Sequence, residues 1–95
     1  MADEGAPERR RGRTRDEVRD RLFALMRENA RIDPAALREE ARLADDLRMD
    51  SLDLVSVVNE VEHEFRIRIP DSVLGKLTDI RSVVDALWEH LAGAP

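Results

Sequence analysis

The chain has 95 residues, which allows one small domain with a modest apolar core. It contains no cysteine, and this excludes disulfide bonds and thiolate metal sites. The formal net charge is −5, with an acidic block in residues 45–64, which favours basic protein partners over nucleic acids. No apolar run approaches the about 18 residues of a membrane-spanning helix, and no signal peptide is apparent. We therefore expect a monomeric, cytoplasmic protein that does not bind membranes.

Residues 1–13 are expected to form a disordered tail. They lack apolar periodicity and contain Gly5, Pro7 and Gly12. Four arginines lie within residues 9–13, and a cluster of this kind can contact RNA or DNA. Beside an acidic body, however, such a cluster is more often solvated. We place the folded domain at residues 14–92.

The first helix is predicted over residues 15–29, because Thr14 and Glu17 have the spacing of a capping box. Its apolar residues fall on one face at helical spacing: Val18, Leu22, Leu25 and Met26. Residues 30–50 should form a long, ordered loop, since the Asp33-Pro34 pair disfavours helix. Its scattered apolar residues would hold it to the core, and residues 34–38 are a candidate for a short helical turn.

The second helix is predicted over about residues 52–66, with Asp50 or Ser51 as the N-cap. When successive residues are placed 100° apart around the helix axis, five apolar residues fall on one face, which should be the core face: Leu54, Val57, Val58, Val61 and Phe65. Leu52 falls on the opposite face, directly after Ser51. It is a candidate anchor for a partner, although a first-turn residue can also fold back onto the preceding loop.

The last part of the chain predicts a short helix and a long one. Residues 67–69 alternate like a strand but are too few, and Pro70 interrupts them. Asp71 is expected to cap a short helix over residues 72–76, and Thr78 to cap a helix over residues 79–91. The apolar residues of this last helix recur at helical spacing: Ile80, Val83, Val84, Leu87, Trp88 and Leu91. The chain is therefore all-α: a small antiparallel four-helix bundle of three main helices and one short helix, with a long loop between the first two.

Ser51 has the surroundings of a substrate and not of a catalyst. A nucleophilic serine needs an adjacent base, but the nearby side chains at positions 45, 46, 50 and 53 are carboxylates. Negative charge raises the pKa of a hydroxyl group, and both histidines are distant in sequence. No base, thiol or metal-binding cluster suggests an enzyme. Ser51 is then either a helix cap alone or a site that another enzyme modifies.

Residues 43–70 resemble the acyl carrier proteins of fatty acid and polyketide synthesis. The matching segments are Asp45-Asp46-Leu47, Asp50-Ser51-Leu52-Asp53, Glu62-His63-Glu64-Phe65 and Ile67-Arg68-Ile69-Pro70-Asp71. The resemblance implies that residues 14–92 are an acyl-carrier domain and that Ser51 carries 4′-phosphopantetheine. The chain would then be a phosphoprotein. It also implies that a phosphopantetheinyl transferase supplies this group from coenzyme A with Mg²⁺. Asp50 would then help to orient the transferase and its metal.

The resemblance also implies partners and cargo. The arm would hold acyl groups as thioesters, and an apolar bundle interior can in principle admit the acyl chain. Acyltransferase and ketosynthase-type enzymes with basic docking surfaces would bind one face of the second helix. The residues of that face are Leu52, Val55, Ser56, Asn59 and Glu62.

Three departures from the family pattern leave the pathway open. Arg48 stands where a glycine is usual, Asn59 where a methionine is common, and Arg66 and Arg68 add positive charge. Fatty acid, polyketide and secondary-metabolite synthesis all remain as interpretations. A peptidyl or aminoacyl carrier is an alternative, although Asp50 in place of a histidine favours acyl cargo. The other alternative is a helical interaction module in which Ser51 is never modified.

Overall fold

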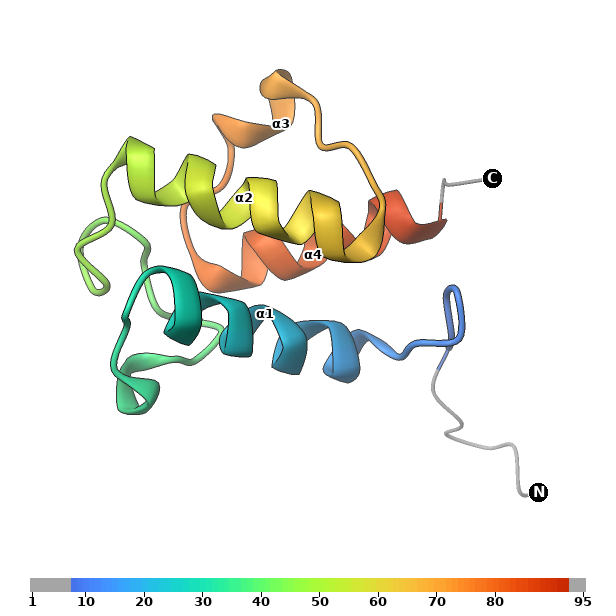
Figure 1. Cartoon of the computed structure of the whole chain (residues 1–95), viewed down its shortest axis with the longest axis horizontal. Coiled ribbons are helices and arrows are strands. Elements are labelled where there is room, and N and C mark those ends of the chain that lie inside the picture. The colour runs from blue at the N-terminus through green and yellow to red at the C-terminus, as the bar shows by residue number, and fades with distance from the viewer. Residues whose placement is uncertain (1–7, 93–95) are drawn as a thin grey trace.

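The computed structural model describes residues 8–92 of the chain. This part contains four α-helices, one 3₁₀ helix and no β-strand. The elements are α1 (Arg15–Asn29), η1 (Pro34–Ala36), α2 (Ser51–Phe65), α3 (Asp71–Leu74) and α4 (Ile80–Ala92). In Figure 1, α1 runs opposite to both α2 and α4 and packs against each of them. The predicted all-α bundle is confirmed, and none of the helices within residues 8–92 is long and apolar enough to cross a membrane.

Both predicted capping signals of the first two helices are confirmed. The Thr14 hydroxyl accepts from the Glu17 N–H at 3.1 Å, and the Glu17 carboxylate accepts from the Thr14 N–H at 2.8 Å. Asp50 caps α2 in the same reciprocal way with Asp53, at 2.8 and 3.2 Å. Because Asp50 is the cap, α2 begins at Ser51, one residue earlier than predicted.

The predicted caps of the last two helices are wrong. Asp71 is the first residue of α3 and not its cap, and Pro70 precedes it without a side-chain capping bond. At the start of α4, the Asp79 carboxylate accepts from the Ser82 N–H at 2.8 Å. The Ser82 hydroxyl in turn accepts from the Asp79 N–H at 3.2 Å, so the two residues cap the helix start reciprocally. The cap therefore lies one residue later than predicted.

Apolar residues of α1, α2, α4 and the long loop form one core. The predicted core residues are buried, except that Leu54 and Trp88 are half-buried at its edge. In the loop, the buried residues are Ala41, Leu43, Leu47 and Met49. The predictions of an ordered loop and of a short helical turn near residue 34 are confirmed. Leu52 points away from this core, with 75% of its surface exposed.

Residues 8–13 differ from the disordered tail that the sequence predicts. The N–H and C=O groups of Arg10 and Arg13 bond to each other at 2.8 and 3.1 Å. Arg11 and Gly12 between them have positive φ angles of 56° and 79°, as a tight two-residue turn requires. The expectation does not hold for this part of the segment, and residues 1–7 lie outside the described residues.

The turn lies at the end of the bundle remote from the start of α2 (Figure 1). Arginine side chains attach it to α2 and α4. The Arg10 guanidinium lies 4.3 Å from the Trp88 ring centroid and donates to the Trp88 carbonyl at 2.7 Å. Arg11 donates to the Phe65 carbonyl at 2.8 Å, and Arg13 lies 4.7 Å from the Phe65 ring centroid. Cation–π contacts and cationic donors at helix C-terminal ends both stabilise such an arrangement.

Replacing Arg10 by alanine should change the environment of Trp88, the single tryptophan of the chain. The substitution removes a cation–π contact and a charged hydrogen bond, so we expect a loss of about 1–2 kcal/mol in the free energy of unfolding. Tryptophan fluorescence and thermal melting measure both effects. Arg9→Ala is the matched control, because Arg9 is 59% exposed and, among residues 8–92, contacts Gly12 and Glu17 but neither α2 nor α4. If the two variants have the same tryptophan fluorescence and the same melting temperature, Arg10 does not attach the turn to Trp88.

Candidate functional site

Ser51 is an exposed residue at the first position of α2. The first-turn N–H groups of a helix have no partners within it, and they give this end a partial positive charge. The Asp50–Asp53 capping box satisfies one of these groups and fixes where the helix begins. The result is a serine hydroxyl that solvent and a second protein can reach.

The electrostatics around Ser51 agree with the substrate interpretation. Within residues 8–92, no histidine, lysine or carboxylate is hydrogen-bonded to the Ser51 hydroxyl to serve as a base. Asp50 and Asp53 accept backbone hydrogen bonds from each other's N–H groups. In the same range, no group of three or more His, Asp or Glu side chains is placed to hold a metal ion.

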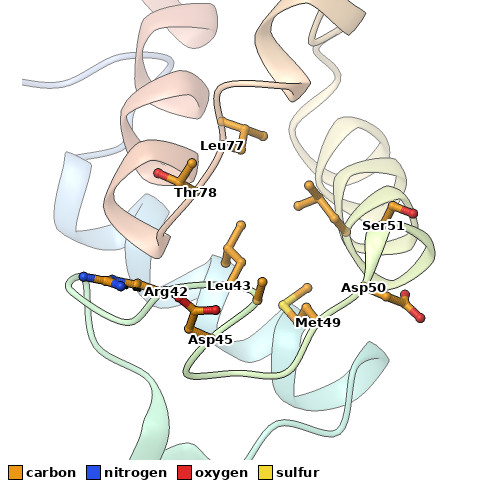
Figure 2. A pocket seen from close by; sticks show the side chains of 10 residues that line it. Arg42, Leu43, Asp45, Met49, Asp50, Ser51, Leu77 and Thr78 are labelled. Atoms are coloured by element: carbon orange, nitrogen blue, oxygen red, sulfur yellow. Dashed lines mark hydrogen bonds and ion pairs between the residues drawn. The ribbon is translucent and has the colours of Figure 1, made fainter.

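An apolar cavity of about 330 Å³ lies directly beside Ser51. It is lined by residues 42–45 and 49–50 of the loop, by Ser51 and Leu54 of α2, and by residues 77–78 ahead of α4. Figure 2 shows Leu43, Met49 and Leu77 around this space, whereas the polar ends of Asp50 and Ser51 point away from it. A group attached to the serine therefore begins at the rim of an apolar space.

Arg48 adopts the backbone conformation that explains why a glycine is usual at this position. Its φ angle is 57°, in the left-handed region that a side chain disfavours. The following Met49 N–H donates to the Leu43 carbonyl at 2.9 Å and closes the loop against the cavity. The substitution of glycine by arginine thus leaves the loop path intact but adds backbone strain.

Four of the five predicted partner-binding residues share an exposed surface. Leu52 and Val55 are 75% and 46% exposed, and Ser56 and Asn59 are also exposed along α2. Glu62 is different, because it is half-buried and its carboxylate accepts from the Ile69 N–H at 2.7 Å. It holds the segment after α2 in place, and this bond uses one of its carboxylate oxygens.

Two carboxylates connect separate elements of the fold, and the sequence did not identify either of them. Glu39 in the loop is bound by Arg15 of α1 at 3.0 and 3.1 Å, and this hydrogen-bonded pair holds the pKa of Glu39 below its ordinary value. The guanidinium of Arg21 in α1 makes two hydrogen bonds to the carboxylate of Glu64 in α2, one of them at 3.1 Å. This pair lowers the pKa of Glu64 in the same way. No periodicity marks either residue, because such pairs depend on contacts between distant segments.

The comparison with known families agrees with this geometry. A family described as "Phosphopantetheine attachment site" matches residues 20–87. An acyl carrier protein of Thermotoga maritima is 33% identical over 78 residues, which are 82% of this chain and 96% of that protein. One of Campylobacter concisus is 39% identical over 70 residues, 74% of this chain and 86% of that protein. Acyl carrier protein 2, mitochondrial, of Arabidopsis thaliana is 36% identical over 76 residues, 80% of this chain and 60% of that protein.

The chain is thus a carrier-type protein with a phosphopantetheine attachment domain. It belongs to the acyl carrier protein family, whose members carry a covalent cofactor and are not catalysts. The residues present fit that cofactor: Ser51 offers an exposed hydroxyl, and the apolar cavity begins beside it.

Replacing Arg48 by glycine should stabilise the domain. Glycine removes the left-handed strain of about 1–2 kcal/mol but loses about 0.4–1 kcal/mol through greater freedom of the unfolded chain. We expect a net gain of roughly 0.5–1 kcal/mol in urea unfolding. Arg38→Gly is the control, because Arg38 is exposed in the same loop without a positive φ angle. Arg38→Gly should lose stability. If Arg48→Gly loses stability as well, the strain assigned to Arg48 is refuted.

Proposed function

We propose that Ser51 is the attachment residue for 4′-phosphopantetheine and that the chain carries acyl intermediates to enzymes of fatty acid, polyketide or secondary-metabolite synthesis. The bound arm supplies a terminal thiol that holds the acyl group as a thioester. The observation that carries this proposal is the position of Ser51: exposed, first in α2, and at the rim of an apolar cavity. Tethering raises the effective concentration of the cargo at each successive enzyme.

The other serines lack this combination of features. The chain has four serines, and Ser51 is the one that lines the cavity. Ser56 lies one turn further along α2, and Ser72 lies in the short helix α3. The hydroxyl of Ser82 donates to the Asp79 carbonyl at 2.7 Å and belongs to the start of α4. These differences support Ser51 as the modified residue.

Asp50 would act in two ways. It caps α2 and so determines where the Ser51 hydroxyl lies, and its exposed carboxylate would orient the phosphopantetheinyl transferase and the Mg²⁺ of that enzyme. The helix start favours a phosphodiester on Ser51 by roughly 0.3–1 kcal/mol. The surrounding carboxylates oppose it by a comparable, screened amount. A dedicated transferase is therefore needed to attach the group.

The exposed side of α2 is the proposed surface for partner enzymes. Leu52 and Val55 give it apolar contacts beside the modified serine, and Ser56 and Asn59 extend it along the helix. The half-buried Glu62 lies at its edge, with one carboxylate oxygen bonded to Ile69. The exposed carboxylates around Ser51 would attract acyltransferase and ketosynthase-type enzymes through basic docking surfaces.

Intact mass should rise by one phosphopantetheine when the protein is incubated with coenzyme A, Mg²⁺ and a broad-specificity phosphopantetheinyl transferase. Ser51→Ala should gain no mass. Ser56→Ala, a matched change on the same helix, should gain as much mass as the wild-type protein. No gain in a folded wild-type protein would overturn the carrier proposal and favour an unmodified interaction module. Loading of the arm by an amino-acid adenylating enzyme, and not from acyl-CoA, would indicate a peptidyl carrier.

An octanoyl group on the arm should enter the cavity, because its lining is apolar. Methyl resonances of Leu43, Leu54 and Leu77 should then shift more on octanoylation than on acetylation, which leaves no chain long enough to reach them. Methyl-resolved NMR on the loaded protein measures this difference. Identical spectra for the two cargoes would show that the chain stays in solvent.

A further inference from the structure

Glu39 connects three parts of the molecule at one point. Its carboxylate accepts from Arg15 of α1 at 3.0 and 3.1 Å and lies 3.5 Å from Arg81 of α4. Arg19 lies 3.7 Å away, and Asp85 holds the far side of the Arg15 guanidinium at 2.7 Å. The side chain of Glu39 is 17% exposed, so solvent screens these contacts less than those of a surface pair.

The backbone of the loop is bonded to the start of α4 at the same place. The Glu39 carbonyl accepts from the Arg81 N–H at 2.9 Å, and the Ala41 carbonyl accepts from the Ile80 N–H at 3.0 Å. The Leu43 N–H donates to the Thr78 carbonyl at 2.9 Å. Residues 39–43 therefore run alongside residues 78–81, joined by three hydrogen bonds.

This junction continues directly into the wall of the cavity beside Ser51. Leu43 ends the bonded segment on the loop side, and Thr78 ends it on the other side, with Leu77 directly before it. All three residues line the cavity (Figure 2). A change in the spacing of the two segments therefore changes the opening of the cavity. The Ser51 side of the cavity, on α2, does not take part in this junction.

We infer that Glu39 is a positioning residue for the cargo: its ion pairs hold the cavity wall closed around an acyl chain carried on Ser51. This inference rests on the proposed function. Without the carboxylate, Arg15 and Arg81 lose their shared acceptor, and the wall is held by the three backbone bonds, the packing of Ala41 and Leu43 and the exposed Glu40–Arg81 pair. The opening that follows would let water reach a thioester at the cavity rim.

Glu40 provides a matched control one residue away. Its carboxylate is 65% exposed and lies 3.8 Å from Arg81, and within residues 8–92 it forms no ion pair with an arginine of α1. Glu39→Gln and Glu40→Gln remove the same charge from neighbouring positions of one loop. An effect of net charge alone would be equal in the two variants. Loss of the contacts that join the loop to both α1 and α4 occurs only in Glu39→Gln.

The first measurement is hydrogen exchange on the unmodified protein. In Glu39→Gln, the amides of Leu43, Ile80 and Arg81 should exchange about tenfold faster than in the wild type, because a charged hydrogen bond that restrains their opening is lost. Amides in the middle of α2 and all amides of Glu40→Gln should be unchanged. Uniformly faster exchange in Glu39→Gln would overturn the inference, since Glu39 would then act only on global stability.

The second measurement is the lifetime of thioesters on the arm in mildly alkaline buffer. A hexanoyl thioester should hydrolyse several-fold faster in Glu39→Gln than in the wild type, whereas an acetyl thioester, too short to use the cavity, should hydrolyse equally in both. Equal hexanoyl lifetimes would overturn the inference. Arg15→Lys, which keeps the charge but loses the two-point contact, should give a smaller effect in the same direction and replaces Glu39→Gln if that variant fails to fold.

The two proposals fail in distinguishable ways. Intact mass reports whether Ser51 accepts phosphopantetheine, and Glu39→Gln should gain the group at the wild-type rate. If the wild type gains nothing, the proposed function fails, while hydrogen exchange still tests the junction. If loading is normal but the local exchange or the hexanoyl lifetime does not change, the role of Glu39 alone is refuted.

Discussion

The reciprocal hydrogen bonds between Asp50 and Asp53 are the constraint on which the rest of the site depends. They fix the first residue of α2, and each residue of a helix is rotated by about 100° from the one before. With the start set at Ser51, Leu54 reaches the cavity while Leu52 and Val55 remain exposed. A start one residue later would release Ser51 from the helix and separate the hydroxyl from the cavity rim.

The loop before α2 is long because it also forms half of the cavity. It buries Leu43, Leu47 and Met49 and needs a left-handed residue at position 48 to return to α2. The chain uses arginine there, and the other non-glycine residues with positive φ within residues 8–92 are Arg11, Arg31 and Arg66. Each is exposed, so the long side chain extends into solvent, and core packing elsewhere offsets the strain of Cβ against the backbone.

Periodicity and capping signals predict the parts of this structure that local sequence determines. The bounds of α1, the Asp50 cap and the core faces of α2 and α4 follow from residues a few positions apart. The same reasoning missed the contacts of Arg10 and Arg11 with α4 and α2 and the ion pairs of Glu39. Each of these depends on a partner far away in the sequence, and no spacing within one segment encodes such a partner. The arginine cluster indicated a solvated tail or a contact with nucleic acid.

Charge is distributed unevenly along α2, and this bears on the docking that we propose. The exposed carboxylates of Asp50 and Asp53 lie at the Ser51 end, whereas Arg66, Arg68 and the arginine turn lie at or beyond Phe65. The 15 residues of α2 span about 22 Å, which exceeds the about 8 Å screening length at physiological ionic strength. The exposed Glu60 and the half-buried Glu64, which is paired with Arg21, also lie toward the Phe65 end, so this end presents charges of both signs. A basic partner surface would therefore be directed toward the carboxylates around Ser51, and the arginines would restrict its orientation.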